Sequence, residues 1–180
     1  EKAINAKTRA VFIETVGNPA LGVADIEQYA KIAHAHHLPL VVDSTFTPTP
    51  ILRAIDFGAD LVIHSLSKWY GGHGAGIGGI VVDAGRFDWS DPKFSLYNTP
   101  ARDYHGLVFS QAFGKKAFWY RLLTVGLRNQ GATLAPDAAW IFLQGVESLP
   151  LRIARHSENA LKVAQFLQNH PKVAWVRYPT

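Results

Sequence analysis

The stretch Asp60-Leu-Val-Ile-His-Ser-Leu-Ser-Lys-Trp-Tyr-Gly-Gly-His-Gly74 says most about the fold of this chain. Its apolar start predicts a short buried strand, and Lys68 follows that strand, with hydroxyls at Ser65 and Ser67 just before it. A lone lysine there would be assigned to solvent, because lysines are usually exposed. Open α/β sheets, however, bind their ligands beyond the carboxyl ends of their strands. The hydroxyls and glycines beside Lys68 therefore predict a ligand site.

A second predicted strand ends in the same way. The segment Val41-Val-Asp-Ser-Thr-Phe46 places Asp43 at a strand end, where it is expected to share that site with Lys68. Pyridoxal phosphate (PLP) requires an amine for a Schiff base, a carboxylate that keeps its ring nitrogen protonated, and donors for its phosphate. Lys68, Asp43 and the serine pair can supply these groups in turn. The residues therefore predict a PLP site with Lys68 as the catalytic amine.

Three segments stand in a characteristic order along the chain: Glu14-Thr-Val-Gly-Asn-Pro19, Val41-Val-Asp-Ser-Thr-Phe46 and His64-Ser-Leu-Ser-Lys-Trp-Tyr-Gly-Gly-His-Gly74. In this order and spacing the chain resembles the Cys/Met-metabolism family of fold-type I PLP-dependent enzymes. Within that family it is most similar to the branch that acts on O-acetylhomoserine, through four segments: Gly71–Gly79, Phe87–Trp89, Tyr104–Gly106 and Phe142–Arg152. The resemblance runs along nearly all of the chain.

The resemblance implies a fold and a division into domains. The fold would be the α/β fold of fold-type I PLP-dependent transferases, with a mostly parallel sheet covered by helices and a smaller α+β C-terminal domain. Residues 1–150 would be part of the large PLP-binding domain. Residues 151–180 would be the linking helix and the first strand of a truncated C-terminal domain. The chain contains no methionine, not even an initiator, which agrees with an internal piece of a longer protein.

The resemblance also implies further site residues. Asn18 would contact the phenolic oxygen of the cofactor, although the bare sequence identifies it only as a turn residue before a proline. Thr45 would support Asp43 or the cofactor ring. Ser65, Ser67 and Lys68 complete the expected cofactor-binding set. Other cofactor and substrate contacts known in the family fall outside this chain.

The activity that the resemblance implies is replacement of the γ-substituent of O-acetylhomoserine by sulfide or methanethiol, giving homocysteine or methionine and acetate. An O-succinylhomoserine sulfhydrylase, a methionine γ-lyase and an inactive fragment that only binds a cofactor or partner remain alternatives. Family members build their sites across subunits, so a homodimer or homotetramer is expected.

Composition excludes several other classes of protein. Hydrophobic residues make up 48% of the 180 residues, enough for one substantial core. No apolar run approaches the roughly 20 residues of a membrane helix and no signal peptide is evident, so a cytoplasmic protein is expected. The net charge is +4, but the basic residues are dispersed and nucleic-acid binding is not expected. Without cysteine, and with the clustered histidines near residue 36 assigned to a helix end, no metal site is expected.

Alternating apolar runs and amphipathic stretches predict the alternating strands and helices of a mostly parallel sheet. The predicted strands are Thr8–Glu14, Leu40–Asp43, Leu61–His64, a buried strand at Ile77–Val82, and Val173–Val176. The predicted helices are Asp25–His37, Ile51–Phe57, Phe109–Val125, Pro136–Gln144 and Leu151–Asn169. Residues 84–105 lack periodicity and are expected to form a long, ordered loop.

Overall fold

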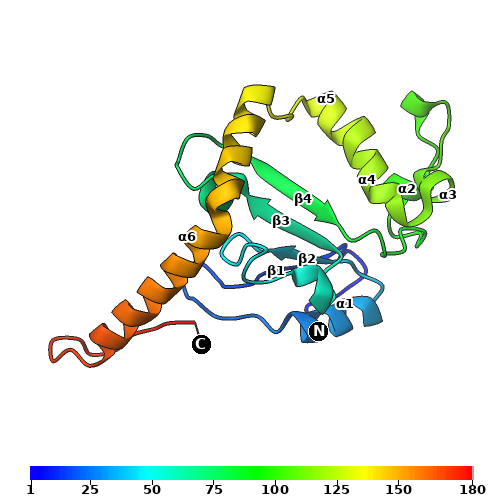
Figure 1. The fold of residues 1–180 in the computed structure, drawn as a ribbon. Helices are drawn as coiled ribbons and strands as arrows, with labels where there is room; N and C mark the ends of the chain where they lie inside the picture. Colours follow the sequence, from blue (N-terminus) through cyan, green and yellow to red (C-terminus); the bar gives the residue numbers. More distant parts are fainter. Residues whose placement is uncertain (180) are drawn as a thin grey trace.

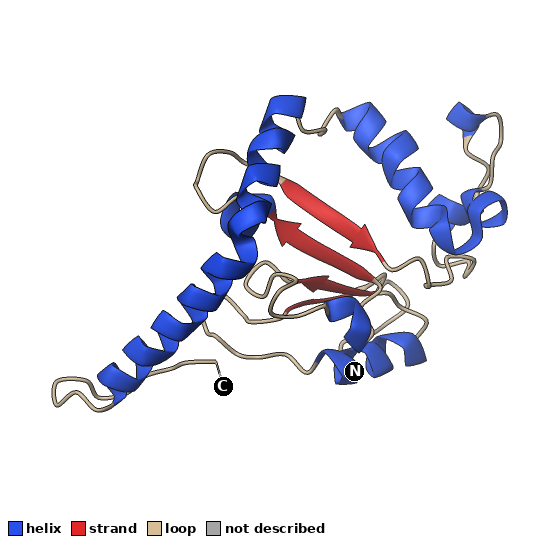
Figure 2. Cartoon of the chain, viewed as in Figure 1, coloured by secondary structure: helices blue, strands red, loops and turns tan. Residues whose placement is uncertain are grey.

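The computed structural model describes residues 1–179, which contain a four-stranded sheet (Figure 1, Figure 2). Its strands, in spatial order, are β1 (Val11–Glu14), β2 (Leu40–Asp43), β3 (Leu61–Ser65) and β4 (Gly79–Asp83). Strands β1, β2 and β3 are parallel, and β4 runs antiparallel to β3. The mostly parallel sheet expected from the sequence is confirmed, and its three parallel strands end at one edge.

Helix α1 (Ile26–Ala35) connects β1 to β2 and packs on the sheet. It begins after Asp25, whose side chain accepts a hydrogen bond from the backbone N–H of Gln28 at 3.0 Å and so satisfies a free amide of the first turn. Its buried residues are spaced three or four apart, as one helix face requires: Ile26, Ala30 and Ala33. In the main hydrophobic core they join residues of the sheet: Leu40, Val42 and Val62.

Residues 84–105 form the ordered loop expected from the sequence, and aromatic packing holds it together. Trp89 is buried, with its ring centroid 4.7 Å from that of Phe87 and 5.5 Å from that of Phe94. Each edge-to-face pair of this kind adds about 0.5–1.5 kcal/mol beyond the burial of its area. The loop contains two short helical turns: α2 (Ser95–Asn98) and η3 (Arg102–Tyr104).

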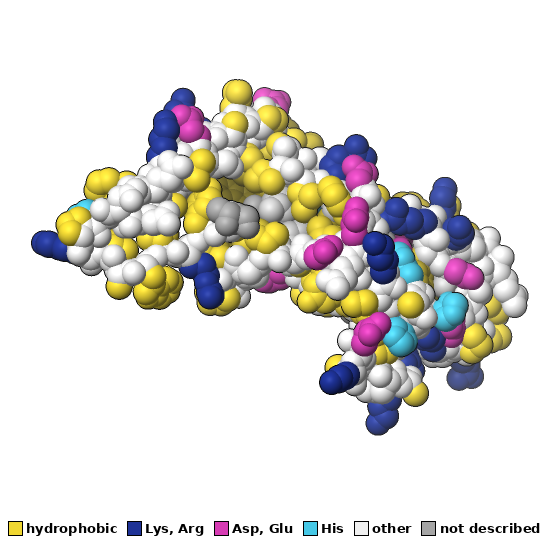
Figure 3. All heavy atoms as spheres, turned by 90° about the horizontal axis from the view of Figure 1, so that it is seen from below, with side chains coloured by type: hydrophobic (Ala, Val, Ile, Leu, Met, Phe, Trp, Pro, Cys, Tyr) yellow, Lys and Arg dark blue, Asp and Glu magenta, His cyan; other side chains and the backbone are white. Residues whose placement is uncertain are grey.

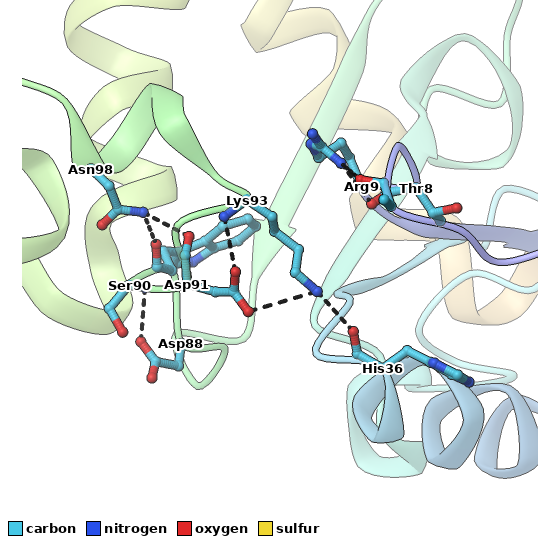
Figure 4. A network of polar contacts seen from close by, with 10 residues as sticks. Thr8, Arg9, His36, Asp88, Ser90, Asp91, Lys93 and Asn98 are labelled. Carbon is cyan, nitrogen blue, oxygen red and sulfur yellow. Dashed lines mark hydrogen bonds and ion pairs between the residues drawn. The ribbon is translucent and has the colours of Figure 1, made fainter.

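Polar contacts tie the same loop to α1 (Figure 4). The side-chain amide of Asn98 donates to the backbone carbonyls of Trp89 and Asp91, each at 2.9 Å. Lys93 Nζ donates to the carbonyl of His36 at 3.0 Å and pairs with the Asp91 carboxylate at 3.6 Å. Because His36 caps the C-terminal end of α1, the lysine also meets the negative end of the helix dipole. The loop is thereby fixed against the first helix.

A series of short helical segments leads from this loop into one long helix. The short segments are α3 (Phe109–Phe113), η4 (Gly114–Lys116), α4 (Ala117–Arg121), η5 (Leu122–Leu127) and α5 (Arg128–Gln130). The single helix predicted at Phe109–Val125 is therefore wrong, because the backbone at Gly114, with φ +53° and ψ −125°, interrupts it. The long helix, α6 (Pro136–Gln168), crosses the edge at which β1, β2 and β3 end (Figure 1). The sequence predicts two helices separated around Pro150, and this prediction is wrong.

Helix α6 continues through Pro150 because its buried face outweighs the cost of the proline. A proline inside a helix costs about 3 kcal/mol. Three large side chains of α6 are buried, and each such burial stabilises by about 1.5–3 kcal/mol: Phe142, Leu149 and Ile153. The helix packs against a tight turn that follows β3, η2 (Leu66–Tyr70). Tertiary packing therefore overrides the local signal to stop.

Three other elements also differ from the prediction. The strand expected to be buried at Ile77–Val82 is the exposed β4, whose residues Ile80, Val81 and Val82 are 43%, 41% and 36% exposed. Residues 173–176 form no strand within the described chain, because no strand of residues 1–179 pairs with them. The helix predicted at Ile51–Phe57 is a single 3-10 turn, η1 (Ala54–Phe57).

The surface mixes charges of both signs with apolar side chains. On the face seen in Figure 3, basic side chains lie singly or in small groups among acidic and hydrophobic ones. Five large apolar residues of α6 are more than half exposed: Trp140, Leu143, Leu151, Val163 and Phe166. None of the helices in residues 1–179 is long and apolar enough to cross a bilayer.

Helix α6 and the turn η2 meet backbone to backbone at Gly145. A Cβ at this position would collide with the carbonyl oxygens of Tyr70 and Gly71. We expect Gly145→Ala to lower the free energy of unfolding, measured by urea denaturation, by about 1–3 kcal/mol, the usual cost of overpacking. Gly22→Ala is the matched control, because a Cβ at Gly22 would meet no atom within 4 Å. Equal stability of the two variants would contradict the close contact.

Candidate active site

The parallel strands end side by side at Glu14, Asp43 and Ser65, and a cavity of about 680 Å³ opens beyond them. All six site residues predicted from the sequence line this cavity: Asn18, Asp43, Thr45, Ser65, Ser67 and Lys68. Open parallel sheets bind ligands at this position, because side chains from several strand ends converge there. The structure therefore brings the predicted residues together in one place.

Thr45 links the ends of two neighbouring strands. Its backbone N–H donates to Oδ1 of Asp43 at 2.9 Å, and its hydroxyl oxygen accepts the backbone N–H of Ser65, also at 2.9 Å. Asp43 and Ser65 are the last residues of β2 and β3. These contacts hold the carboxylate of Asp43 in a half-buried position on the cavity wall.

Lys68 lies in the turn η2 that follows β3. Its backbone angles, φ −98° and ψ −116°, are not helical, so the turn is interrupted at the lysine. The Ser67 hydroxyl oxygen accepts the backbone N–H of Gly78 at 2.9 Å, which ties the turn to the residue before β4. Lys68 itself is exposed and lines the cavity, so its amine is accessible to a ligand there.

Asn18 reaches the cavity from the loop after β1. Its backbone N–H donates to Oε2 of Glu14 at 2.7 Å, so the last residue of β1 holds this loop near the strand end. Asn18 is exposed and lines the cavity.

The chain matches known proteins along its whole length. Residues 1–180 match the family described as Cys/Met metabolism PLP-dependent enzyme. The chain belongs to this family. It is 48% identical to the O-acetyl-L-homoserine sulfhydrylase of Leptospira meyeri, over 99% of this chain and 42% of the relative. The chain thus spans about two fifths of the length of such relatives.

Solved structures of family members share the fold. The O-acetylhomoserine (thiol)-lyase of Campylobacter jejuni, which contains an N'-pyridoxyl-lysine-5'-monophosphate, matches with a TM-score of 0.93 and 38% identity, over 99% of this chain and 44% of that one. The cystathionine γ-lyase of Lactobacillus plantarum matches with a TM-score of 0.70 and 32% identity, over 94% and 36% of the two chains. The fold-type I architecture expected from the sequence is confirmed.

Members of the Cys/Met-metabolism family depend on PLP, and the cavity residues fit this cofactor. Lys68, with its amine, Asp43, with its carboxylate, and the two hydroxyl residues Ser65 and Ser67 all line one cavity. The Ser67 oxygen accepts a hydrogen bond from Gly78, so its own O–H can still donate to a phosphate. The cavity volume of about 680 Å³ lies within the usual range for small-molecule sites. The chain thus contains the amine, carboxylate and donor groups that PLP requires.

The sequence analysis misses the two residues that α6 contributes to the cavity, Arg152 and His156. Both lie on α6, and their spacing of four residues places them on one face of that helix. The ring of His156 packs against that of Trp69, with centroids 5.1 Å apart. The segment Phe142–Arg152 contributes to the family resemblance, but nothing local in it indicates that α6 crosses the strand ends.

His64 lies beside the site and contacts the residue that follows Asp43. It is 5% exposed, and its Nδ1 lies 3.0 Å from the carbonyl oxygen of Ser44, to which it donates in the Nδ1–H tautomer. Its ring meets the ring of Tyr70 edge-on, with centroids 4.9 Å apart. Burial lowers the pKa of His64, and the Ser44 hydrogen bond and the nearby Asp43 charge only partly oppose this shift. A buried, neutral His64 packs and hydrogen-bonds near pH 7.

Because of this shift, His64 should make the protein less stable in mild acid. The pKa of an unfolded histidine is about 6.5 and that of folded His64 is lower, so below about pH 6.5 the unfolded chain binds more protons and the free energy of unfolding falls. His64→Asn keeps a donor for the Ser44 carbonyl but does not titrate. Urea denaturation at several pH values from about 5 to 8 should therefore show a shallower pH dependence for the variant. Identical slopes would contradict the buried neutral histidine.

Proposed function

We propose that the protein is a PLP-dependent transferase that replaces the acetate of O-acetylhomoserine with sulfide, giving homocysteine and acetate, or with methanethiol, giving methionine. The observation that carries this proposal is the convergence of Lys68, Asp43 and the serine pair on one cavity beyond the parallel strands. The Leptospira meyeri and Campylobacter jejuni relatives, both named for action on O-acetylhomoserine, support the substrate.

Each residue of the proposed site has a distinct task. Bound PLP supplies an electron sink that stabilises negative charge on the substrate Cα. Lys68 would bind the cofactor through Nζ and, once released, take the proton from the substrate Cα. Once the amine has released that proton again, it can take the Cβ proton, whose removal allows acetate to leave Cγ. After sulfide has added at Cγ, protons return to Cβ and Cα. Asp43, held by Thr45, would keep the ring nitrogen protonated. The remaining residues would bind the cofactor: Asn18 at its phenolic oxygen, and Ser65 and Ser67 at its phosphate.

The domain division, the assembly and the location in the cell are proposed from the family resemblance. Residues 1–150 would belong to the large PLP-binding domain and residues 151–180 to the link and the start of a smaller domain. The boundary lies inside the continuous helix α6, so its second half would act as a rigid connection. A cytoplasmic homodimer or homotetramer is the proposed form of the whole protein.

Borohydride trapping tests the proposed cofactor site. The intact enzyme is incubated with PLP, reduced with borohydride, digested and analysed by peptide mass spectrometry. A phosphopyridoxyl adduct confined to Lys68 is the expected result. Adducts scattered over other lysines, or missing from Lys68, would overturn the assignment.

Product analysis separates the proposed reaction from those of related enzymes. Homocysteine should form faster from O-acetylhomoserine and sulfide than from O-succinylhomoserine and sulfide, with little release of ketobutyrate. Predominant ketobutyrate release would indicate a γ-lyase instead. A preference for the succinyl ester would change the leaving group but not the assigned residues.

A further inference from the structure

We propose that Arg152 is a positioning residue for Lys68, because it joins α6 to the turn that carries the lysine. The inference rests on the proposed function, in which Lys68 is the catalytic amine. Arg152 and Lys68 line the same cavity but belong to different elements, α6 and η2. Arg152 is half-buried, and its guanidinium lies at the junction of these two elements.

The guanidinium of Arg152 reaches three acceptors. Its Nη2 donates to the carbonyl of Gly145 at 2.8 Å and makes a longer contact, 3.5 Å, with the carbonyl of Tyr70. Its Nε donates to the Ser148 hydroxyl at 3.0 Å. The acceptors on Gly145 and Ser148 belong to α6, whereas Tyr70 ends η2. A planar guanidinium can bond these groups in one fixed arrangement, which a lysine ammonium cannot reproduce.

The backbone after η2 packs directly on this guanidinium. A Cβ on Gly72 would collide with the central carbon and both terminal nitrogens of Arg152. Gly72 has φ +71°, a conformation that glycine adopts at little cost. One residue earlier, the carbonyl of Gly71 would collide with a Cβ on Gly145. The segment 70–72 therefore lies against α6 at both Arg152 and Gly145.

The same segment closes the turn around Lys68. The backbone N–H of Gly71 donates to the Leu66 carbonyl, and that of Gly72 donates to the Lys68 carbonyl, each at 2.8 Å. Because Gly72 bonds Lys68 and packs on Arg152, a displacement of the guanidinium would move the peptide group of the lysine. The non-helical backbone of Lys68 is thus stabilised from outside its own turn. Arg152 acts on the amine by fixing the backbone from which it extends.

The reactivity of Lys68 in the cofactor-free protein tests this role without relying on turnover. Reductive methylation over a range of pH, followed by peptide mass spectrometry, gives the labelling rate of Lys68 relative to Lys31, an exposed lysine on α1. Arg152→Lys and Arg152→Met should each change the labelling rate of Lys68 severalfold and alter how that rate depends on pH. Lys31 should label equally in all proteins.

Kinetics provide the second readout. In the active enzyme the Arg152 variants should lower kcat by about 10- to 100-fold with little change in KM, because small misplacements of a reacting group cost this much. Arg155→Met is the matched control: Arg155 lies on the same helix, is 68% exposed and pairs with Glu158. Its kcat and its Lys68 labelling should stay unchanged. Ser148→Ala removes one of the three acceptors of Arg152, so it should change kcat and Lys68 labelling in the same direction but by less. This variant keeps the test possible if the Arg152 variants fail to fold.

The outcomes separate this inference from the proposed reaction. An unchanged Lys68 pH profile in folded Arg152→Met protein, or in Ser148→Ala protein if the Arg152 variants do not fold, would overturn the positioning role. A raised KM with unchanged kcat would also overturn it, because Arg152 would then act in substrate binding. Altered Lys68 labelling in an enzyme that does not use O-acetylhomoserine would support the positioning role and contradict the proposed reaction.

Discussion

Lys68→Ala should abolish turnover while leaving the fold intact. Lys68 is exposed at the cavity, so its truncation removes little packing. The variant loses both the amine that would bind PLP covalently and the base that would take the Cα proton. Proton transfer by a positioned side chain alone contributes about 10²- to 10⁴-fold, so kcat should fall by at least about 10³-fold. Homocysteine formation from O-acetylhomoserine and sulfide by the intact enzyme measures this loss.

Cofactor binding distinguishes a catalytic loss in Lys68→Ala from a general loss of structure. Asp43 and the serines remain in place, so the variant should retain part of its affinity for PLP in equilibrium dialysis. Lys31→Ala is the matched control, because Lys31 is also exposed but lies on α1 and does not line the cavity. It should keep the unsubstituted kcat. Near-normal turnover of Lys68→Ala would remove the lysine from the proposed mechanism.

Two site residues could be predicted from their position alone, because each lies at or shortly after the end of a buried run. In a parallel sheet, the carboxyl ends of all strands lie at one edge, so a polar residue that follows an apolar run is expected at that edge. Asp43 and Lys68 are found in this way, and β2 has the bounds predicted for it, Leu40–Asp43. Here the local pattern and the tertiary structure agree.

The features that could not be found depend on contacts between distant parts of the chain. Arg152 reaches the site only because α6 crosses the strand ends. The hydrophobic periodicity of the α6 sequence does not predict where the helix lies relative to the sheet. Pro150 is a local stop signal that packing overrides. The apolar residues of β4 suit a buried strand, but in the structure they are exposed. Their apolar character alone does not indicate whether another helix or strand packs on them. Composition indicates what a segment can bury, whereas only the fold shows what packs against it.

Asp43→Asn should produce the second large effect. Asparagine keeps a side-chain oxygen that can accept the backbone N–H of Thr45, a contact of 2.9 Å in the structure, so the cavity wall should persist. The variant loses the negative charge that would keep a proton on the cofactor ring nitrogen. Loss of a preorganised electrostatic contact typically costs about 10²- to 10³-fold, and the rate of Cα-proton exchange with solvent should fall by about this factor. Deuterium incorporation at the substrate Cα, followed by NMR, measures the rate.

Two further variants show whether the charge of Asp43 causes this effect. Asp56→Asn removes a carboxylate of η1 that is 52% exposed and pairs with Arg53, so exchange should continue at the unsubstituted rate. Asp43→Glu restores the charge at a slightly different position and should recover part of the exchange rate. Unchanged exchange in Asp43→Asn would exclude the aspartate from the proposed role. Equal defects in Asp43→Asn and Asp43→Glu would assign the loss to the position of the side chain, because charge alone would then restore nothing.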